Sequence, residues 1–135
     1  MIVLDTNVLS EPLRPEPDQR VLSWLASHPI AAVTAVSVGE LLGGVLRLPT
    51  GRRREALATS IREALDGAGE ILPYDEPAAR VFAEIQDARR RMGRPLSTED
   101  GMIAAICLAR GASLATRNIS DFDGLGVELV NPWES

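Results

Sequence analysis

Acidic side chains recur where apolar segments of this chain end or helical patterns begin. Asp5 directly follows the apolar run Ile2–Leu4, Glu40 and Asp100 lie near the starts of two helical patterns, and Asp121 lies shortly after a fourth apolar run. Carboxylates that meet in space repel one another, and a bound cation is what makes such a cluster tolerable. If these positions converge in the fold, they predict a metal-dependent hydrolase.

The composition restricts the chemistry of such a site. With one histidine and one cysteine, the chain lacks the ligands of a usual zinc site and the two histidines of an acid–base ribonuclease. It has no lysine, which excludes a P-loop lysine and Schiff-base chemistry. Oxygen ligands are what Mg²⁺ and Mn²⁺ prefer, so phosphodiester chemistry here would use carboxylates and one of these ions.

Each acid also has an ordinary structural interpretation. Ser37 and Glu40 match a capping box, Ser97 and Asp100 nearly do, and Asp5 could cap a helix that follows it. The metal-site interpretation gains from the glycines beside Glu40 and Asp100, which allow close approach of backbone or ligand. It gains most from the expectation that several independent acids share one rim of the fold.

The bulk properties predict one globular domain over residues 1–135. Hydrophobic residues make up 45 % of the chain, and no 18-residue apolar run predicts a membrane span. The start of the sequence lacks the features of a signal peptide, and Cys107 is the lone cysteine, so we expect a cytoplasmic protein. A net charge of −5 and a pI of about 4.9 count against a protein that simply coats nucleic acid, but not against a nuclease.

The elements that must position these acids alternate along the chain. Strands are expected at 2–4, 30–34, 70–72, 113–116 and 127–130, and helices at 18–28, 37–46, 52–67, 75–92 and 97–110. This alternation predicts an α/β fold, a single-domain α/β/α sandwich around a central parallel sheet. In such sheets the ligand crevice lies outside the carboxyl ends of the strands, where all the acids could face one another.

Two arginine clusters have open interpretations. Arg52–Arg54, and Arg89–Arg91 with Arg94, could hold RNA phosphates, but runs of charge are more often solvated helix faces, which we favour. Arg117 flanks the acidic loop and is the better candidate for contact with a phosphate.

Four sequence motifs in order resemble a known family. The motifs are LDTNVLSEP, AVSVGELLGG around Glu40, STEDGMIAAICLARG around Asp100, and the C-terminal LATRNISDFDGLGVELVNPW. Together they resemble a PIN-domain ribonuclease, closest to the VapC/FitB-type toxins of type II toxin–antitoxin modules, over essentially the whole chain.

The resemblance implies a Mg²⁺- or Mn²⁺-dependent endoribonuclease that forms a homodimer. It also implies RNA as substrate and a cognate antitoxin with a basic segment, often carrying an arginine, that enters the acidic site. The toxin and antitoxin would form a larger complex on DNA.

By motif match, Asp5, Glu40 and Asp100 take metal-binding, catalytic positions. The fourth position is open between Asn118 and Asp121, because some members of the family have Asp where this chain has Asn118, and an acid three residues later is also common in this loop. An amide oxygen brings less charge than a carboxylate, which puts a second metal in doubt. We expect Thr6, Thr116 and Arg117 to support the site.

Two other functions stay open at this level. The first is a weakly catalytic or non-catalytic module that binds a basic antitoxin and acts in a DNA-binding complex, which Asn118 would favour. The second, weaker hypothesis is a metal-dependent phosphatase that acts on small substrates.

Overall fold

The computed structural model describes all 135 residues and contains five short strands. All strand pairs are parallel. The strands are β1 (Ile2–Leu4), β2 (Val33–Thr34), β3 (Ile71–Leu72), β4 (Ser113–Ala115) and β5 (Leu129–Val130).

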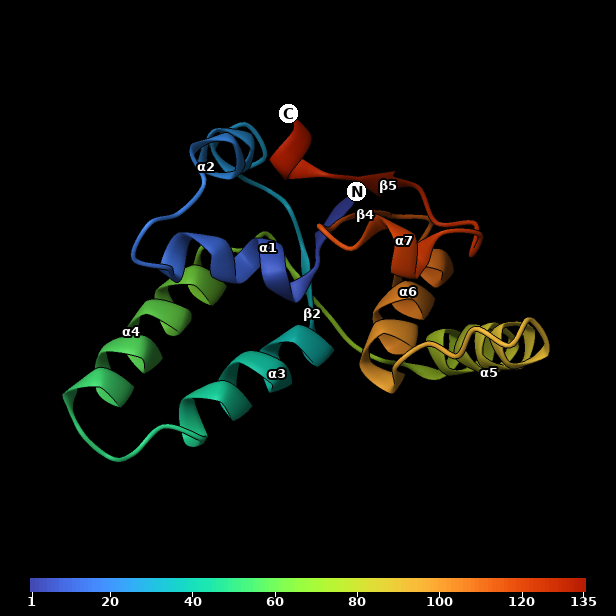
Figure 1. Cartoon of the computed structure of the whole chain (residues 1–135), viewed down its shortest axis with the longest axis horizontal. Helices are drawn as coiled ribbons and strands as arrows, with labels where there is room; N and C mark the ends of the chain where they lie inside the picture. The colour runs from blue at the N-terminus through green and yellow to red at the C-terminus, as the bar shows by residue number, and fades with distance from the viewer.

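Seven α-helices and two 3₁₀ helices surround the strands (Figure 1). They are α1 (Thr6–Ser10), η1 (Glu11–Leu13), α2 (Gln19–Ala26), α3 (Ala35–Leu46), α4 (Arg52–Asp66), α5 (Glu76–Arg91), α6 (Thr98–Arg110), α7 (Ile119–Phe122) and η2 (Pro132–Glu134). None of the helices is long and apolar enough to cross a membrane.

Strand pairing joins the two ends of the chain in one sheet. The order β1-β4-β5 forms one ladder and β2-β3 another. A parallel bridge between Val3 and Ala32 connects the ladders, with the Leu4 N–H donating to the Ala32 carbonyl at 2.8 Å. The resulting order β3-β2-β1-β4-β5 places β1 at the centre, so Asp5 leaves the middle of the sheet.

Alternating side chains of the strands supply two separate cores. Val3, Leu72 and Leu114 pack with α5, α6 and α7, and Leu4 and Ala115 pack on the opposite face. That second face is covered by α1 to α4 and by Trp133 of η2. Figure 1 shows α3 and α4 on one side of the strands and α5 and α6 on the other. The predicted α/β/α sandwich with a central parallel sheet is therefore confirmed.

Three elements of a single turn or little more were not predicted, namely α7, η1 and η2, and a helix at α1 was indicated only by the interpretation of Asp5 as its cap. Except for β1, the strands are also shorter than predicted, most clearly β2, which begins at Val33 instead of Ile30. Ile30 is 85 % exposed and precedes the ladder, although its side chain is apolar. Apolar character alone therefore misplaced the start of this strand.

The start of α3 corrects one prediction about the site. The helix begins at Ala35 because the Thr34 hydroxyl, at the end of β2, accepts the Ser37 N–H at 3.1 Å. Ser37 is therefore an interior residue, and the predicted capping box from Ser37 to Glu40 is wrong. Glu40 lies in the second turn of α3, so capping no longer accounts for its presence.

Candidate functional site

Asp5 lies at the carboxyl end of the central strand and is only 4 % exposed. It caps α1, as one interpretation of the sequence predicted: its Oδ1 accepts the Thr6 N–H at 2.8 Å. Its Oδ2 accepts the Thr116 hydroxyl at 2.7 Å. Burial raises the pKa of this carboxyl, and these two hydrogen bonds only partly oppose the shift.

Thr116 links Asp5 to the loop after β4. The residue is fully buried, and its hydroxyl oxygen also accepts the Asn118 N–H at 3.0 Å. The neighbouring strand thus fixes both the rotamer of Asp5 and the start of the acidic loop. Thr116 therefore contacts a predicted metal ligand, and its supporting role stays a prediction.

Hydrogen bonds between two hydroxyls and Glu40 link α1 to α3. The Thr6 hydroxyl donates to Glu40 Oε1 at 2.7 Å and lies 2.8 Å from the Ser37 Oγ. Because a hydroxyl has only one proton to donate, Ser37 must be the donor to Thr6. Ser37 is fully buried, so these hydrogen bonds anchor the exposed Glu40 carboxylate to the interior.

Asp100 lies in the first turn of α6, where the Ser97 side chain caps the helix as predicted. Burial raises the pKa of Asp100, and the nearby negative charge of Asp5 raises it further. Asp121 and Glu40 contribute to the same shift, and Asp121 also raises the pKa of Asp5. These four carboxylates, from the residue after β1 and from α3, α6 and α7, therefore share one electrostatic environment at the carboxyl edge of the sheet.

None of the four carboxylates forms an ion pair with an arginine or histidine. Their oxygens are hard ligands, and a buried acid such as Asp5 lacks any positive partner, so the donor set fits a divalent cation. The side chains do not form a ready-made cage, because no three acidic, histidine or cysteine side chains stand close enough together to hold an ion. The site is chemically suited to Mg²⁺ or Mn²⁺ but open in shape.

Other predicted residues take distinct positions. Asn118 is exposed, precedes α7 and makes no side-chain capping bond, whereas Asp121 shares a cavity of about 270 Å³ with Asp100. The Arg117 guanidinium lies 5.1 Å from the centre of the Trp133 ring and not against the carboxylates. Cys107 is buried, which raises its thiol pKa to about 12 and leaves it protonated at neutral pH.

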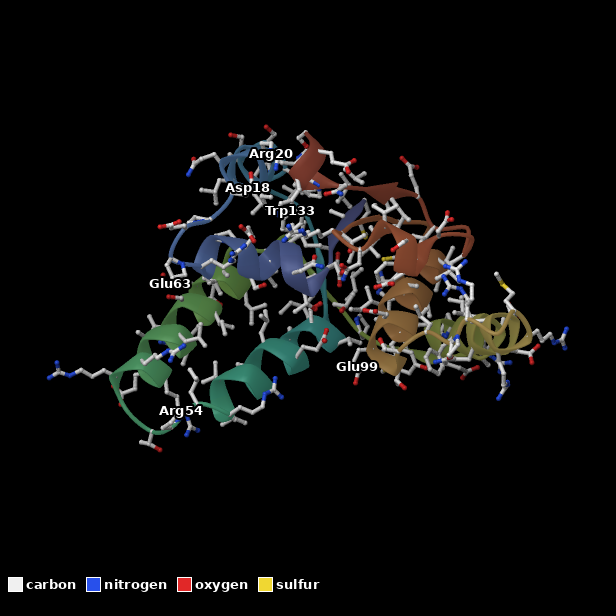
Figure 2. The ribbon with its side chains drawn as sticks, viewed as in Figure 1. Asp18, Arg20, Arg54, Glu63, Glu99 and Trp133 are labelled. Carbon is white, nitrogen blue, oxygen red and sulfur yellow. The ribbon has the colours of Figure 1, made fainter.

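Glu99 and Ser37 extend the site beyond the predicted residues. Figure 2 shows Glu99 at the start of α6, on the side that faces α3, where it lines a cavity with Glu40. The sequence signal for Ser37 was its hydroxyl inside an apolar helix, which we read as a cap. Figure 2 shows Arg54 near the start of α4, away from Glu99.

Comparison with known proteins identifies the family. Residues 2–126 match the PIN domain. The chain belongs to the PIN-domain family. It is 39 % identical to the VapC ribonuclease Y4jK of Sinorhizobium fredii, over 99 % of each chain, and 39 % identical to toxin FitB of Neisseria gonorrhoeae, over 98 % of this chain and 99 % of that one.

Solved structures agree with the PIN fold over the full length. The crystal structure of FitAcB from Neisseria gonorrhoeae matches with a TM-score of 0.90 at 37 % identity, covering 100 % of both chains. The structure of FitAB bound to an IR36 DNA fragment matches with a TM-score of 0.86 at 37 % identity, covering 98 % of this chain and 96 % of that chain. The predicted resemblance to VapC/FitB-type PIN proteins is confirmed.

Proposed function

We propose that this PIN-domain protein is the toxin of a type II toxin–antitoxin module and acts as a Mg²⁺- or Mn²⁺-dependent endoribonuclease. The observation that carries the proposal is the set of four carboxylates without positive partners at the carboxyl edge of the sheet. Similarity to proteins named VapC ribonuclease and toxin FitB supports the reaction and the biological role.

The proposed roles of the acidic residues differ with their exposure. Buried Asp5, fixed by Thr116, and half-buried Asp100 would hold the cation. Asp121 would bind it with them, and we favour Asp121 over Asn118 for the fourth acidic position of the site. Exposed Glu40, oriented by Thr6, is suited to accept a proton from the attacking water. When bound, the cation supplies positive charge that activates water and stabilises the phosphodiester in the transition state.

The open shape of the site suggests how cation and RNA bind. Mg²⁺ commonly uses one or two carboxylates, several waters and substrate phosphates instead of a complete protein cage. We therefore propose that RNA phosphate completes a site that the carboxylates alone leave loose.

Cleavage of RNA tests this function. Wild-type protein should cut RNA with Mg²⁺ or Mn²⁺, and Asp5→Asn or addition of EDTA should reduce cleavage by about 100-fold or more. The partly exposed acid Asp87, which pairs with Arg91 on α5, offers a matched control as Asp87→Asn. If EDTA and Asp5→Asn leave cleavage unchanged, the mechanism is wrong.

A groove beside the site is the observation that favours a protein partner. It has a volume of about 550 Å³, lies between α1, η1, α3 and α4, and extends from apolar Leu41, Leu57 and Ile61 to Glu40. We propose that an antitoxin segment places apolar side chains along this groove and a basic side chain at Glu40. The similar structures named FitAcB and FitAB are toxin–antitoxin complexes, which supports an antitoxin as the partner.

A variant in the groove separates partner binding from catalysis. Leu57→Arg should abolish co-purification with the product of an adjacent reading frame that encodes a DNA-binding domain with a basic tail, while RNA cleavage persists. Ile30→Arg, at an exposed apolar position outside the groove, should change neither property. Retained co-purification of the Leu57→Arg variant would place the partner elsewhere.

The open carboxylate set also favours a second candidate, a binding module with little or no catalysis. No three acids are preassembled for a metal ion, and the amide of Asn118 brings less charge to the acidic loop than a carboxylate would. Calorimetric titration of Mn²⁺ into the partner-free protein separates the two functions. Absence of binding, with RNA left intact, would support the module.

We also propose that the protein forms a homodimer and joins its antitoxin in a larger complex on DNA. The apolar side chains of Leu42 and Leu46 on α3 are 45 % and 67 % exposed, and a second copy could cover them. Light scattering of the purified protein measures this directly, and a monomer at micromolar concentration would contradict it.

A further inference from the structure

Arg89, near the end of α5, is buried although it belongs to a run of arginines. It is only 3 % exposed, whereas the side chains of its neighbours Arg90 and Arg91 are 78 % and 79 % exposed and pair with Asp87. The prediction of a solvated helix face is therefore correct for those neighbours and wrong for Arg89. Burial of a guanidinium is costly unless its donors are satisfied, so the position needs an explanation.

The guanidinium of Arg89 binds backbone carbonyls and no carboxylate. Its Nη2 donates to the carbonyl oxygens of Asp121 at 2.7 Å and Asp123 at 3.0 Å, and its Nη1 donates to the Arg94 carbonyl at 3.4 Å. No acidic side chain forms an ion pair with it. The buried charge thus holds the carbonyl end of α7, where the peptide dipoles favour a cation.

The turn that ends α5 directs a second arginine, Arg94, toward α7. Gly93 adopts a φ of +69°, the Gly93 N–H donates to the Arg90 carbonyl, and the Arg94 N–H returns to the Arg89 carbonyl at 3.0 Å. This helix stop turns Arg94 toward α7, where its Nη2 donates to the Ser120 carbonyl at 3.4 Å. Two arginines of one segment therefore contact consecutive parts of α7.

α7 depends on such contacts because it is only four residues long and lacks a side-chain cap at Asn118. Phe122 anchors one side of it in the core, but Asp121 is exposed. Arg89, Arg94 and Asp121 line the same cavity as Asp100. Arg89 is thus the buried contact that connects the backbone of Asp121 to the body of the protein.

We infer that Arg89 is a positioning residue that holds Asp121 in register with Asp5 and Asp100. It acts through the α7 backbone and touches neither cation nor RNA, and its effect on catalysis rests on the proposed nuclease function. The competing explanation is that Arg89 contributes only to the overall stability of the fold.

Amide hydrogen exchange of the metal-free protein tests the positioning independently of catalysis. Arg89→Met should accelerate exchange of residues 117–126 about ten-fold at millisecond mixing times, with the rest of the chain unchanged. Arg89→Lys should give a smaller increase, because one ammonium group reaches fewer carbonyls. Arg90→Met, at the exposed neighbour, should have no effect. Exchange that rises uniformly over the chain, or not at all, would overturn the inference.

A double-mutant cycle tests the consequence for the site. Arg89→Met should lower RNA cleavage per folded molecule about 10- to 100-fold in the wild-type background, but much less in the Asp121→Asn background. Equal losses in both backgrounds would show that Arg89 does not act through Asp121. If the wild-type protein cleaves no RNA, the proposed function fails, and the exchange measurement alone then decides the role of Arg89.

Discussion

At the scale of single residues, Asp5 carries a buried charge that destabilises the folded state, although its carboxylate accepts two hydrogen bonds. The carboxylate is buried beside other acids, and its pKa lies above the ordinary value despite bonds from Thr6 and Thr116. A carboxyl with a raised native pKa destabilises the folded state once pH exceeds its pKa in the unfolded chain, which is about 3.9. A purely structural residue would have little reason to keep this charge.

Asp5→Asn should therefore stabilise the metal-free protein near pH 7 by a few degrees in Tm. The difference from wild type should vanish as pH falls below about 4, because both forms are then neutral. Thermal unfolding monitored by circular dichroism at several pH values measures the effect.

Asp18→Asn is a control of opposite sign. Arg20 lowers the pKa of Asp18 through side-chain and backbone hydrogen bonds, so its charge stabilises the fold at neutral pH. That variant should have a lower Tm near pH 7 and approach wild type at low pH. A destabilised Asp5→Asn protein would mean that the charge at Asp5 serves folding.

Thr6→Val removes the hydroxyl that orients Glu40 while keeping the shape of the side chain. Loss of a hydrogen bond that orients a catalytic group typically costs about 10- to 100-fold in activity. We expect RNA cleavage per folded molecule to fall by about ten-fold, and Tm to fall by a few degrees because the buried Ser37 hydroxyl loses its acceptor. Thr59→Val, at an exposed position on α4, should leave the cleavage rate unchanged, and an unaffected Thr6→Val enzyme would remove Thr6 from the mechanism.

At the scale of elements, the long periodic helices and the central strands were predictable. The apolar runs before Asp5 and around Leu114 became β1 and β4, and the helices after Asp18, Asp75 and Ser97 begin at the predicted caps. The one-turn helix α7 was missed, and α1 was indicated only by its cap Asp5, because four or five residues carry no helical period. Tertiary contacts create them, as the bonds from Arg89 to α7 illustrate.

The entrance to β3 provides a strict test of the sheet geometry. A Cβ on Gly69 would lie 2.4 Å from the Ile30 carbonyl oxygen, so Gly69→Ala must displace backbone. We expect a loss of about 2 kcal/mol or more in the free energy of unfolding. Gly67→Ala, two residues earlier, meets only ordinary contacts of 3.5 Å at a φ of −80° and should be neutral or slightly stabilising. Urea unfolding compares the two, and equal stabilities would contradict the close approach.

At the scale of the whole molecule, the order of the strands explains why dispersed residues form one site. Asp5, Glu40, Asp100 and Asp121 are up to 116 residues apart in sequence, but parallel strands deliver the adjoining loops to one edge. This convergence was predictable from the alternation of strands and helices. The hydroxyl chain from Ser37 through Thr6 was not, because it needs the packing of α1 against α3.

The negative charge of the molecule gives the proposed cation a second role, in the binding of RNA. A net charge of −5 disfavours RNA, and the four carboxylates concentrate negative charge where the phosphate must bind. A divalent ion at this edge would offset part of this negative charge and offer the phosphate a direct cationic ligand, which would allow an acidic protein to act on a polyanion.

Restoration of RNA cleavage by Mn²⁺ after chelation tests the central claim most directly. Protein stripped with EDTA and dialysed should be inactive, and added Mn²⁺ should restore cleavage with a saturable dependence in the wild type and in Asp87→Asn. Asp100→Asn should need far more Mn²⁺ or remain inactive. Cleavage by the stripped protein without added metal, or equal Mn²⁺ dependence of Asp100→Asn and wild type, would contradict a carboxylate-held cation as the basis of activity.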